Sequence, residues 1–147
     1  MMSTSDFTTT ILVDQSPAEV FKAINNVGGW WDGEITGGTH KLNEEFSYRM
    51  KEFHFSKQKV VELVPDKKVV WLVTESRLNF IKDKNEWTGT KIIFGISEAG
   101  GKTQVRFTHE GLVPEIECYG DCSGGWTQLI QKSLFSLITA GEGKKVF

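Results

Sequence analysis

The sequence predicts an α+β fold, a curved antiparallel sheet wrapped around a long C-terminal helix with short helices after the first strand. Segments in which apolar and polar side chains alternate fill the middle of the chain and are joined by short turns, a pattern typical of an antiparallel sheet. Near the C-terminus apolar residues instead recur every three or four positions, as on an amphipathic helix. A sheet with one apolar face must bury it, and this helix is the only predicted element long enough to cover it.

The first elements are a strand and a short helix. Residues 7–13 are rich in Thr, Val and Ile, which favours a strand. Ser16-Pro17-Ala18-Glu19 supplies a hydroxyl N-cap, a proline at the first helical position and a carboxylate three residues after the serine, so a helix begins here. Asn25, Asn26, Gly28 and Gly29 end it, and we expect Trp30-Trp31 to form a second helical turn or a tight corner before the glycine-rich residues 33–39.

Five more strands are expected in the middle of the chain. Residues 46–51 alternate between large apolar and polar side chains, which indicates a half-buried strand. Residues 59–64 and 69–74 flank a turn that begins with proline, and they predict a hairpin. Residues 90–97 and 103–109 flank a Gly-Gly turn and predict a second hairpin.

The last element is a long amphipathic helix, which follows a loop over residues 111–125. Its apolar stripe begins at Trp126 and repeats at intervals of three and four residues. The helix stops at residues 141–143, where two glycines flank a glutamate. The residues of the stripe are Trp126, Leu129, Ile130, Ser133, Leu134, Leu137 and Ile138.

Length and composition restrict the function. A chain of 147 residues has room for one core, so we expect a single domain over residues 1–147. The formal net charge of −2 gives no general attraction to phosphate, so no nucleic-acid partner is expected. No segment is apolar enough for membrane insertion and no secretory signal is evident, so we expect a cytoplasmic protein. The aromatic content of 12%, from 10 Phe, 5 Trp and 2 Tyr, is high for one small domain.

Five stretches of the chain are recognisable together: Ser16-Pro17-Ala18-Glu19-Val20-Phe21, Val69-Val70-Trp71, Trp87-Thr88-Gly89-Thr90, Phe107-Thr108-His109-Glu110-Gly111-Leu112, and a last helix from Gly125-Trp126 to Ser133-Leu134. Their order resembles that of the helix-grip (SRPBCC) superfamily, which includes START lipid-transfer domains, the birch-pollen allergen and polyketide cyclases. Within it the chain most resembles the branch named for the C-terminal domain of the activator of the ninety-kilodalton heat-shock chaperone's ATPase. The resemblance covers nearly the whole chain.

The resemblance implies an apolar cavity between the sheet and the C-terminal helix that holds a small apolar or aromatic molecule. No cofactor is expected. The residues indicate the same site more weakly, because the inward faces of the predicted elements are rich in aromatic side chains. A fully packed core is the alternative, since protein interiors normally close to a density of ~0.75. The residues expected to line the cavity are Trp30, Trp31, Phe46, Tyr48, Met50, Trp71, Val73, Glu75, Phe94, Phe107, His109, Trp126, Ile130, Ser133 and Leu134.

Two titratable residues fall on the predicted inward face. His109 is in phase with Phe107, so it is either a hydrogen-bond donor or general base in the cavity, or a core histidine satisfied by its neighbours, which we favour. Glu75 lies two residues beyond Val73 and is either a cavity carboxylate paired with His109 or Arg77, or a solvated residue at a strand end. No catalytic residue is assigned.

The two cysteines, Cys118 and Cys122, are separated by three residues. This spacing differs from the two-residue spacing of zinc ribbons and thiol oxidoreductases. A histidine such as His40, His54 or His109 would have to complete any metal site. We therefore expect two buried thiols around the start of the last helix, and no metal.

Three functions compete on this evidence. The first is the binding of a small apolar molecule without catalysis, which the aromatic inward face favours. The second is a cyclase, dehydratase or hydrolase of aromatic substrates, which requires His109 to converge with Tyr48 or Glu75 in one pocket. The third is an interaction module that contacts a chaperone or forms a homodimer. We favour the first.

Overall fold

Seven strands of the described chain form one antiparallel sheet in the order β1-β7-β6-β5-β4-β3-β2. The structure is a computed structural model that describes residues 6–31, 33–52, 54–79, 82, 85–114, 116–117 and 119–144. The strands are β1 (Phe7–Val13), β2 (Glu34–Gly37), β3 (Glu45–Met50), β4 (His54–Val64), β5 (Lys68–Leu78), β6 (Lys91–Ala99) and β7 (Lys102–Glu110). The helical elements are α1 (Pro17–Asn25), the short 3-10 helix η1 (Val27–Gly29), α2 (Tyr119–Gln128), the π-helix η2 (Leu129–Leu134) and α3 (Phe135–Ala140).

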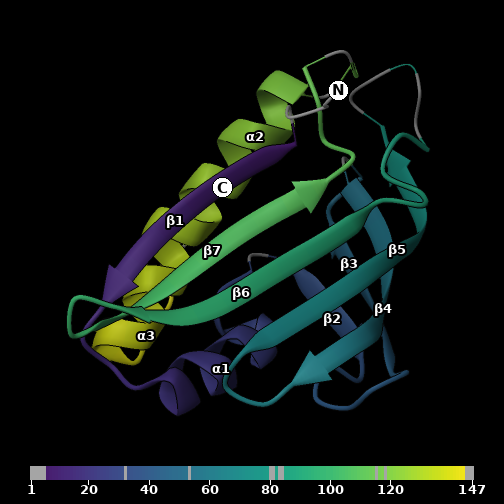
Figure 1. Cartoon of the computed structure of the whole chain (residues 1–147). Coiled ribbons are helices and arrows are strands. Elements are labelled where there is room, and N and C mark those ends of the chain that lie inside the picture. Colours follow the sequence, from purple (N-terminus) through teal and green to yellow (C-terminus); the bar gives the residue numbers. More distant parts are fainter. Residues whose placement is uncertain are drawn as a thin grey trace.

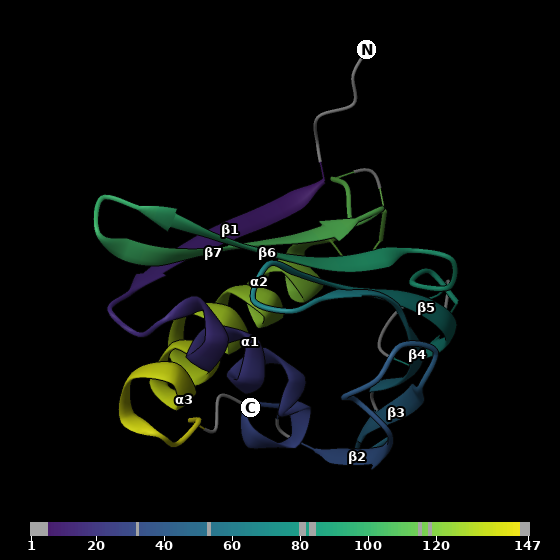
Figure 2. The same ribbon diagram turned by 60° about the horizontal axis from the view of Figure 1, so that its bottom comes forward.

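The sheet curves around a helical rod made of α2, η2 and α3 (Figures 1 and 2). In Figure 2, β1, β7 and β6 cover the rod from above, β2 and β3 curve down at one flank, and α1 lies on the same side of the sheet as α3. None of the helices in the described part of the chain is long and apolar enough to cross a membrane. This arrangement confirms the α+β fold predicted from the alternation of the strands and the period of the last helix.

The short helix α1 begins where the sequence predicts. The Ser16 hydroxyl accepts the backbone N–H of Glu19 at 3.2 Å, and the Glu19 carboxylate accepts the backbone N–H of Ser16 at 3.5 Å. Each side chain thus satisfies an N–H that the first helical turn leaves without a partner. Val20 and Ile24 on the opposite face are fully buried. η1 follows as the predicted corner and places Trp30-Trp31 in the core.

The glycine-rich residues 33–39 contain an edge strand that the sequence pattern did not indicate. β2 pairs with β3, with Gly37 opposite Phe46. Gly37 has a φ of 109°, and a Cβ at this position would clash with the carbonyl oxygen of Glu45. Only glycine allows the two backbones to approach so closely. The pairing with β3, rather than local propensity, therefore makes this segment a strand.

A bulge in β5 changes which of its residues face inward. Lys57 pairs with Glu75 whereas Gln58 pairs with Val73, so Thr74 is an extra residue in β5. Such an insertion shifts the two-residue alternation by one position. Val73 is buried and Glu75 is exposed. The prediction that Glu75 shares the inward face of Val73 is therefore wrong, and its interpretation as a solvated residue is correct.

The last helix is longer than predicted and changes its pitch. It starts at Tyr119, so the expected loop over residues 111–125 is shorter than we predicted. Its centre, η2, is a π-helix, a wider turn that often occurs at functional sites. The rod ends at Gly141, whose φ of 84° is the left-handed conformation that terminates helices, as the sequence indicates. The buried residues of the π-helix are Leu129, Ile130, Ser133 and Leu134.

Candidate functional site

Aromatic rings fill the middle of the core. Trp71, Phe94 and Phe107 are fully buried, and the ring centroids are 5.0 Å apart for Trp71–Phe94 and 5.3 Å apart for Phe94–Phe107. Edge-to-face contacts of this kind leave no room for a ligand among these three rings. The packed-core alternative therefore describes most of the predicted site. The predicted site residues that are buried in this core and do not line the cavity described next are Trp30, Phe46, Trp71, Val73, Phe94, Phe107, Ile130, Ser133 and Leu134.

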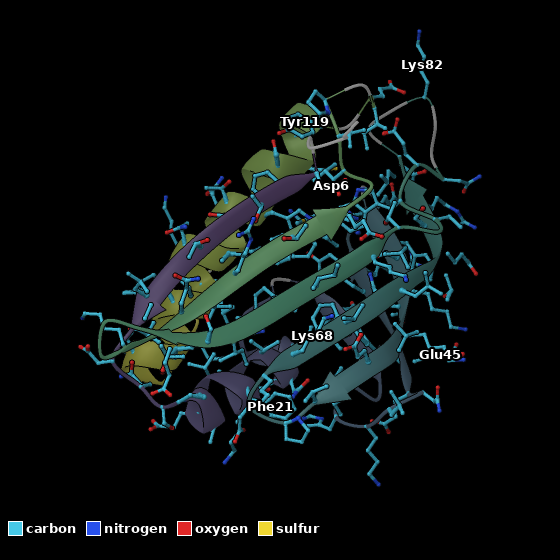
Figure 3. All side chains as sticks on the ribbon, in the orientation of Figure 1. Asp6, Phe21, Glu45, Lys68, Lys82 and Tyr119 are labelled. Atoms are coloured by element: carbon cyan, nitrogen blue, oxygen red, sulfur yellow. The ribbon has the colours of Figure 1, made fainter. Side chains whose placement is uncertain are left out.

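A cavity of about 150 Å³ remains at one end of this core. It lies between α2 on one side and the facing ends of β3 and β4 on the other. The start of α2, marked by Tyr119 in Figure 3, carries the exposed carboxylate of Asp121 beside the cavity. Of the predicted residues, Trp31, Tyr48, Met50 and Trp126 are part of the lining. The full lining is Trp31, Tyr48, Met50, His54, Trp87, Asp121, Cys122, Gly125, Trp126 and Leu129.

The walls of the cavity are formed largely by aromatic rings that pack against one another. Trp31 and Tyr48 are nearly perpendicular, at 86°, with centroids 4.5 Å apart. Trp126 lies 5.5 Å from Trp31 and stacks on Trp87 at 5.8 Å with an interplanar angle of 9°. All four side chains are at most 5% exposed. Rings packed in this way have few alternative rotamers, so the cavity is preformed.

His54 is an uncharged member of the wall. Its ring lies 4.7 Å from Trp87 and 5.2 Å from Tyr48, and its Nε2 is 3.1 Å from the Ser56 hydroxyl. Burial among these rings disfavours the charged imidazolium and lowers the pKa of His54 to about 4. At neutral pH the ring therefore brings no positive charge to the cavity.

His109 lies behind the cavity wall, fully buried as predicted. Its Nδ1 accepts the indole N–H of Trp126 at 3.0 Å. Because an indole nitrogen only donates, the proton of the neutral ring is on Nε2, which donates to the Thr90 hydroxyl at 2.8 Å. The Thr90 hydroxyl in turn donates to the carbonyl of Trp87 at 2.5 Å. Burial, and to a lesser extent the nearby His54, lower the pKa of His109 to about 3.

These bonds decide between the two interpretations of His109. Both ring nitrogens have protein partners, so His109 is a core histidine satisfied by its neighbours. Glu75 is exposed on the other face of β5. Among the described residues, the constellation of His109 with Tyr48 or Glu75 that the enzyme hypothesis requires does not form in the cavity.

The five indole nitrogens differ in their hydrogen bonding. Trp126 donates to His109, and Trp30 donates to the carbonyl of Ile24 at 3.2 Å. The buried Nε1 atoms of the remaining tryptophans have no acceptor within the described part of the chain. The described chain therefore supplies no acceptor within hydrogen-bond distance of these three N–H groups. These remaining tryptophans are Trp31, Trp71 and Trp87.

Sequence reasoning did not assign the remaining lining residues to the site. His54 was considered only as a metal ligand, and Trp87 lies in a turn-rich segment outside any predicted element. Asp121 and Gly125 fell in the predicted loop before the helix. The spacing of Cys122, Trp126 and Leu129 by four and three residues continues the helical stripe, and it is the signal that could have extended the helix toward Tyr119.

The structure describes one of the two cysteines. Cys122 is buried and lines the cavity, while Cys118 lies outside the described residues. Across the ranges that the structure describes, no group of three or more His, Cys, Asp or Glu residues is placed to hold a metal ion. His40 and His54 have hydroxyl neighbours, Thr39 and Ser56.

Comparisons with known proteins identify the family. Residues 14–138 match the family described as Activator of Hsp90 ATPase homolog 1-like protein. A search of curated proteins found no match.

Solved structures share the fold over nearly the whole chain. The Aha1 dimer from Colwellia psychrerythraea is 23% identical, with a TM-score of 0.75 over 95% of this chain and 100% of that chain. The protein SSP2350 from Staphylococcus saprophyticus is 15% identical, with a TM-score of 0.71 over 97% of each chain. DynU16, from the dynemicin biosynthetic locus, is 11% identical, with a TM-score of 0.69 over 98% of this chain and 51% of that chain. At these identities the likeness establishes the fold alone.

Proposed function

The chain belongs to the family of Activator of Hsp90 ATPase homolog 1-like proteins, and from this premise we propose that it binds a small molecule with an apolar or aromatic body in the cavity, without transforming it. The observation that carries the proposal is the preformed cavity of about 150 Å³ with aromatic walls. Small-molecule sites are concave, mostly apolar and largely preformed, and this cavity has these features.

The volume limits the ligand to one ring or one compact branched group. A cavity of about 150 Å³ takes a molecule the size of benzene. Fatty acids, flavonoids and fused aromatic polyketides are too large for it. Small ligands gain at most about 1.5 kcal/mol per non-hydrogen atom, so we expect dissociation constants between micromolar and millimolar.

Tryptophan fluorescence tests the proposal directly, because Trp31, Trp87 and Trp126 line the cavity. We expect a saturable change with one-ring compounds such as toluene, phenol and benzyl alcohol, and none with a flavonoid of several rings. The absence of saturation with every small compound would contradict the proposal.

Two neighbouring glycines of α2 provide a matched pair of variants. Gly125 lines the cavity, so Gly125→Leu should place a side chain in it and abolish binding. Gly124 has open space around it, with nothing within 4 Å of the point where a Cβ would lie, so Gly124→Leu should leave binding unchanged. Equal binding by both variants would place the ligand elsewhere.

The comparisons also support a proposal about partners. The family is named for an activator of the Hsp90 ATPase, and the related protein from Colwellia psychrerythraea is described as a dimer. We therefore propose that this chain forms a homodimer or contacts a chaperone through its outer surface. Analytical ultracentrifugation tests the first contact, and titration with purified Hsp90 tests the second. A monomer at all concentrations that does not bind the chaperone would contradict both.

A further inference from the structure

We propose that the ligand of the cavity is a small organic cation, a quaternary or methylated ammonium held against the Trp and Tyr rings with Asp121 at the entrance. The inference rests on the proposed function, because it names the chemical class of the molecule that the same cavity binds. Three observations support it: the kind of ring in the walls, the sign of the charge around the cavity, and its size.

The aromatic rings that the described residues bring to the cavity are those of Trp, Tyr and His. Trp31, Trp87 and Trp126 line it with Tyr48, whereas no phenylalanine of the described ranges does, although the chain has 10 Phe against 5 Trp and 2 Tyr. The face of a tryptophan ring attracts a cation more strongly than that of phenylalanine. The burial of apolar surface alone does not require Trp and Tyr in place of Phe, because Phe94 is fully buried in the nearby packed core.

The charged side chain in the described lining of the cavity is a carboxylate, that of Asp121. Glu86 precedes the lining residue Trp87, and its carboxylate accepts the backbone N–H of Glu117 at 2.6 Å. Lys82, a basic residue at this end of the molecule, extends its side chain away from the protein in Figure 3. Carboxylates beside a cavity with apolar walls focus a negative potential that attracts cations.

The other lining groups are compatible with a cation. The pKa of His54 is lowered to about 4, so its ring is neutral at pH 7. Met50 and Cys122 add polarisable sulfur atoms to the wall. Asp121 also lies in the first helical turn of α2, where a carboxylate complements the helix dipole. That structural role by itself predicts no preference between a charged and a neutral ligand.

The size of the cavity favours a compact head group. A trimethylammonium group has fewer non-hydrogen atoms than benzene, which a cavity of about 150 Å³ accommodates. Choline adds a short hydroxyethyl arm that reaches toward the entrance. Phosphocholine places an anion on the same arm, where Asp121 would repel it. We therefore infer a free cation rather than the head group of a phospholipid.

Calorimetric titration with choline and with neohexyl alcohol tests the inference, because in the alcohol an uncharged tert-butyl group replaces the trimethylammonium group. We expect choline to bind about tenfold more tightly than the alcohol, and phosphocholine to bind more weakly than choline. Asp121→Asn should weaken choline binding by about fivefold without affecting the alcohol. Glu75→Gln, which removes an exposed carboxylate from the other face of β5, should change neither.

The outcomes separate the inference from the proposed function. Equal binding of choline and neohexyl alcohol, or binding of the alcohol alone, would overturn the cation and leave the proposed function standing. About fivefold weaker binding of choline to Asp121→Asn with an unchanged melting temperature would support the cation. Binding of neither compound, together with no response to one-ring compounds, would contradict the proposed function itself.

Discussion

Trp87 and Trp126 stack with centroids 5.8 Å apart and ring planes 9° apart, yet only the indole N–H of Trp126 has an acceptor among the described residues. Both side chains are at most 5% exposed and both line the cavity. Comparing the two residues therefore separates two contributions to protein stability that usually vary together. One is the packing of the indole ring, and the other is the hydrogen bond of its nitrogen.

Trp126→Phe should destabilise the protein more than Trp87→Phe, by about 1–3 kcal/mol. The first substitution leaves Nδ1 of His109 as a buried acceptor without a donor, whereas the second removes an N–H that had no acceptor in the described part of the chain. Both lose a similar ring area. Urea unfolding of the two variants measures the difference in the free energy of unfolding. Equal losses would show that the bond to His109 contributes nothing.

Stability should fall as the pH decreases below about 6.5, because the pKa values of His54 and His109 are lowered to about 4 and about 3. Between ~6.5 and these values the unfolded chain binds protons that the folded chain excludes. The free energy of unfolding is therefore highest above pH 6.5. It should decrease toward pH 4 by up to about 1.4 kcal/mol per pH unit for each histidine.

A histidine variant checks the origin of this dependence. His54→Gln should reduce the slope between pH 6.5 and pH 5 by about half, since one of the two groups no longer takes up a proton. His54 is also the titratable neighbour that contributes to the lowered pKa of His109. Its ring packs on Tyr48. Urea unfolding across this range is the measurement. A wild-type profile that stays flat down to pH 5 would contradict the assignment.

The sequence was sufficient to predict most of the fold. The capping box at Ser16 and the three-four spacing from Trp126 are local signals, so they predicted the start of α1 and the existence and end of the last helix correctly, though not its start at Tyr119. β2 was missed because its strand depends on a partner strand rather than on its own residues. Glu75 was placed on the wrong face because the extra residue Thr74 reverses the alternation, and a bulge has no signature in this stretch.

The candidate site was only partly predictable. The period of the strands correctly placed Tyr48 and Met50 on the inward face, but it gave no information on volume. Whether aromatic residues fill a space or surround one depends on distances between elements far apart in the chain. Trp87 reaches the cavity from a segment without a regular period, and Asp121 reaches it from a helix with three nearby glycines that weaken the helix signal.

Ser133→Ala should loosen the contact between the last helix and the corner after α1. The buried Ser133 hydroxyl donates to the carbonyl of Trp30 at 2.6 Å and accepts the backbone N–H of Lys144 at 3.1 Å. Removing it leaves both groups without this partner, at a cost of about 1–3 kcal/mol. Thermal unfolding measures this cost, and faster hydrogen exchange at Lys144 locates it.

The control for this variant is Ser136→Ala, one turn further along the rod. Ser136 is also buried, but the described structure gives its side chain no hydrogen bond. Its substitution should change stability by less than about 1 kcal/mol. If the two serine variants were equally stable, the hydrogen bonds of Ser133 would have no net effect.

Gly37→Ala should detach the edge strand β2 from β3 and weaken ligand binding. The alanine would have to adopt a φ of 109° while its Cβ clashes with the carbonyl of Glu45, so we expect a loss of more than about 1 kcal/mol. β3 carries Tyr48 and Met50, so a displaced β2 reduces the support for one cavity wall. Urea unfolding and ligand titration of the same variant measure both effects. The control is Gly124→Ala, because Gly124 is in a helical position with open space around it. This variant should stabilise the protein by ~0.5–1 kcal/mol and leave binding unchanged. A Gly37→Ala variant with the same effects as Gly124→Ala would contradict the close approach of β2 and β3.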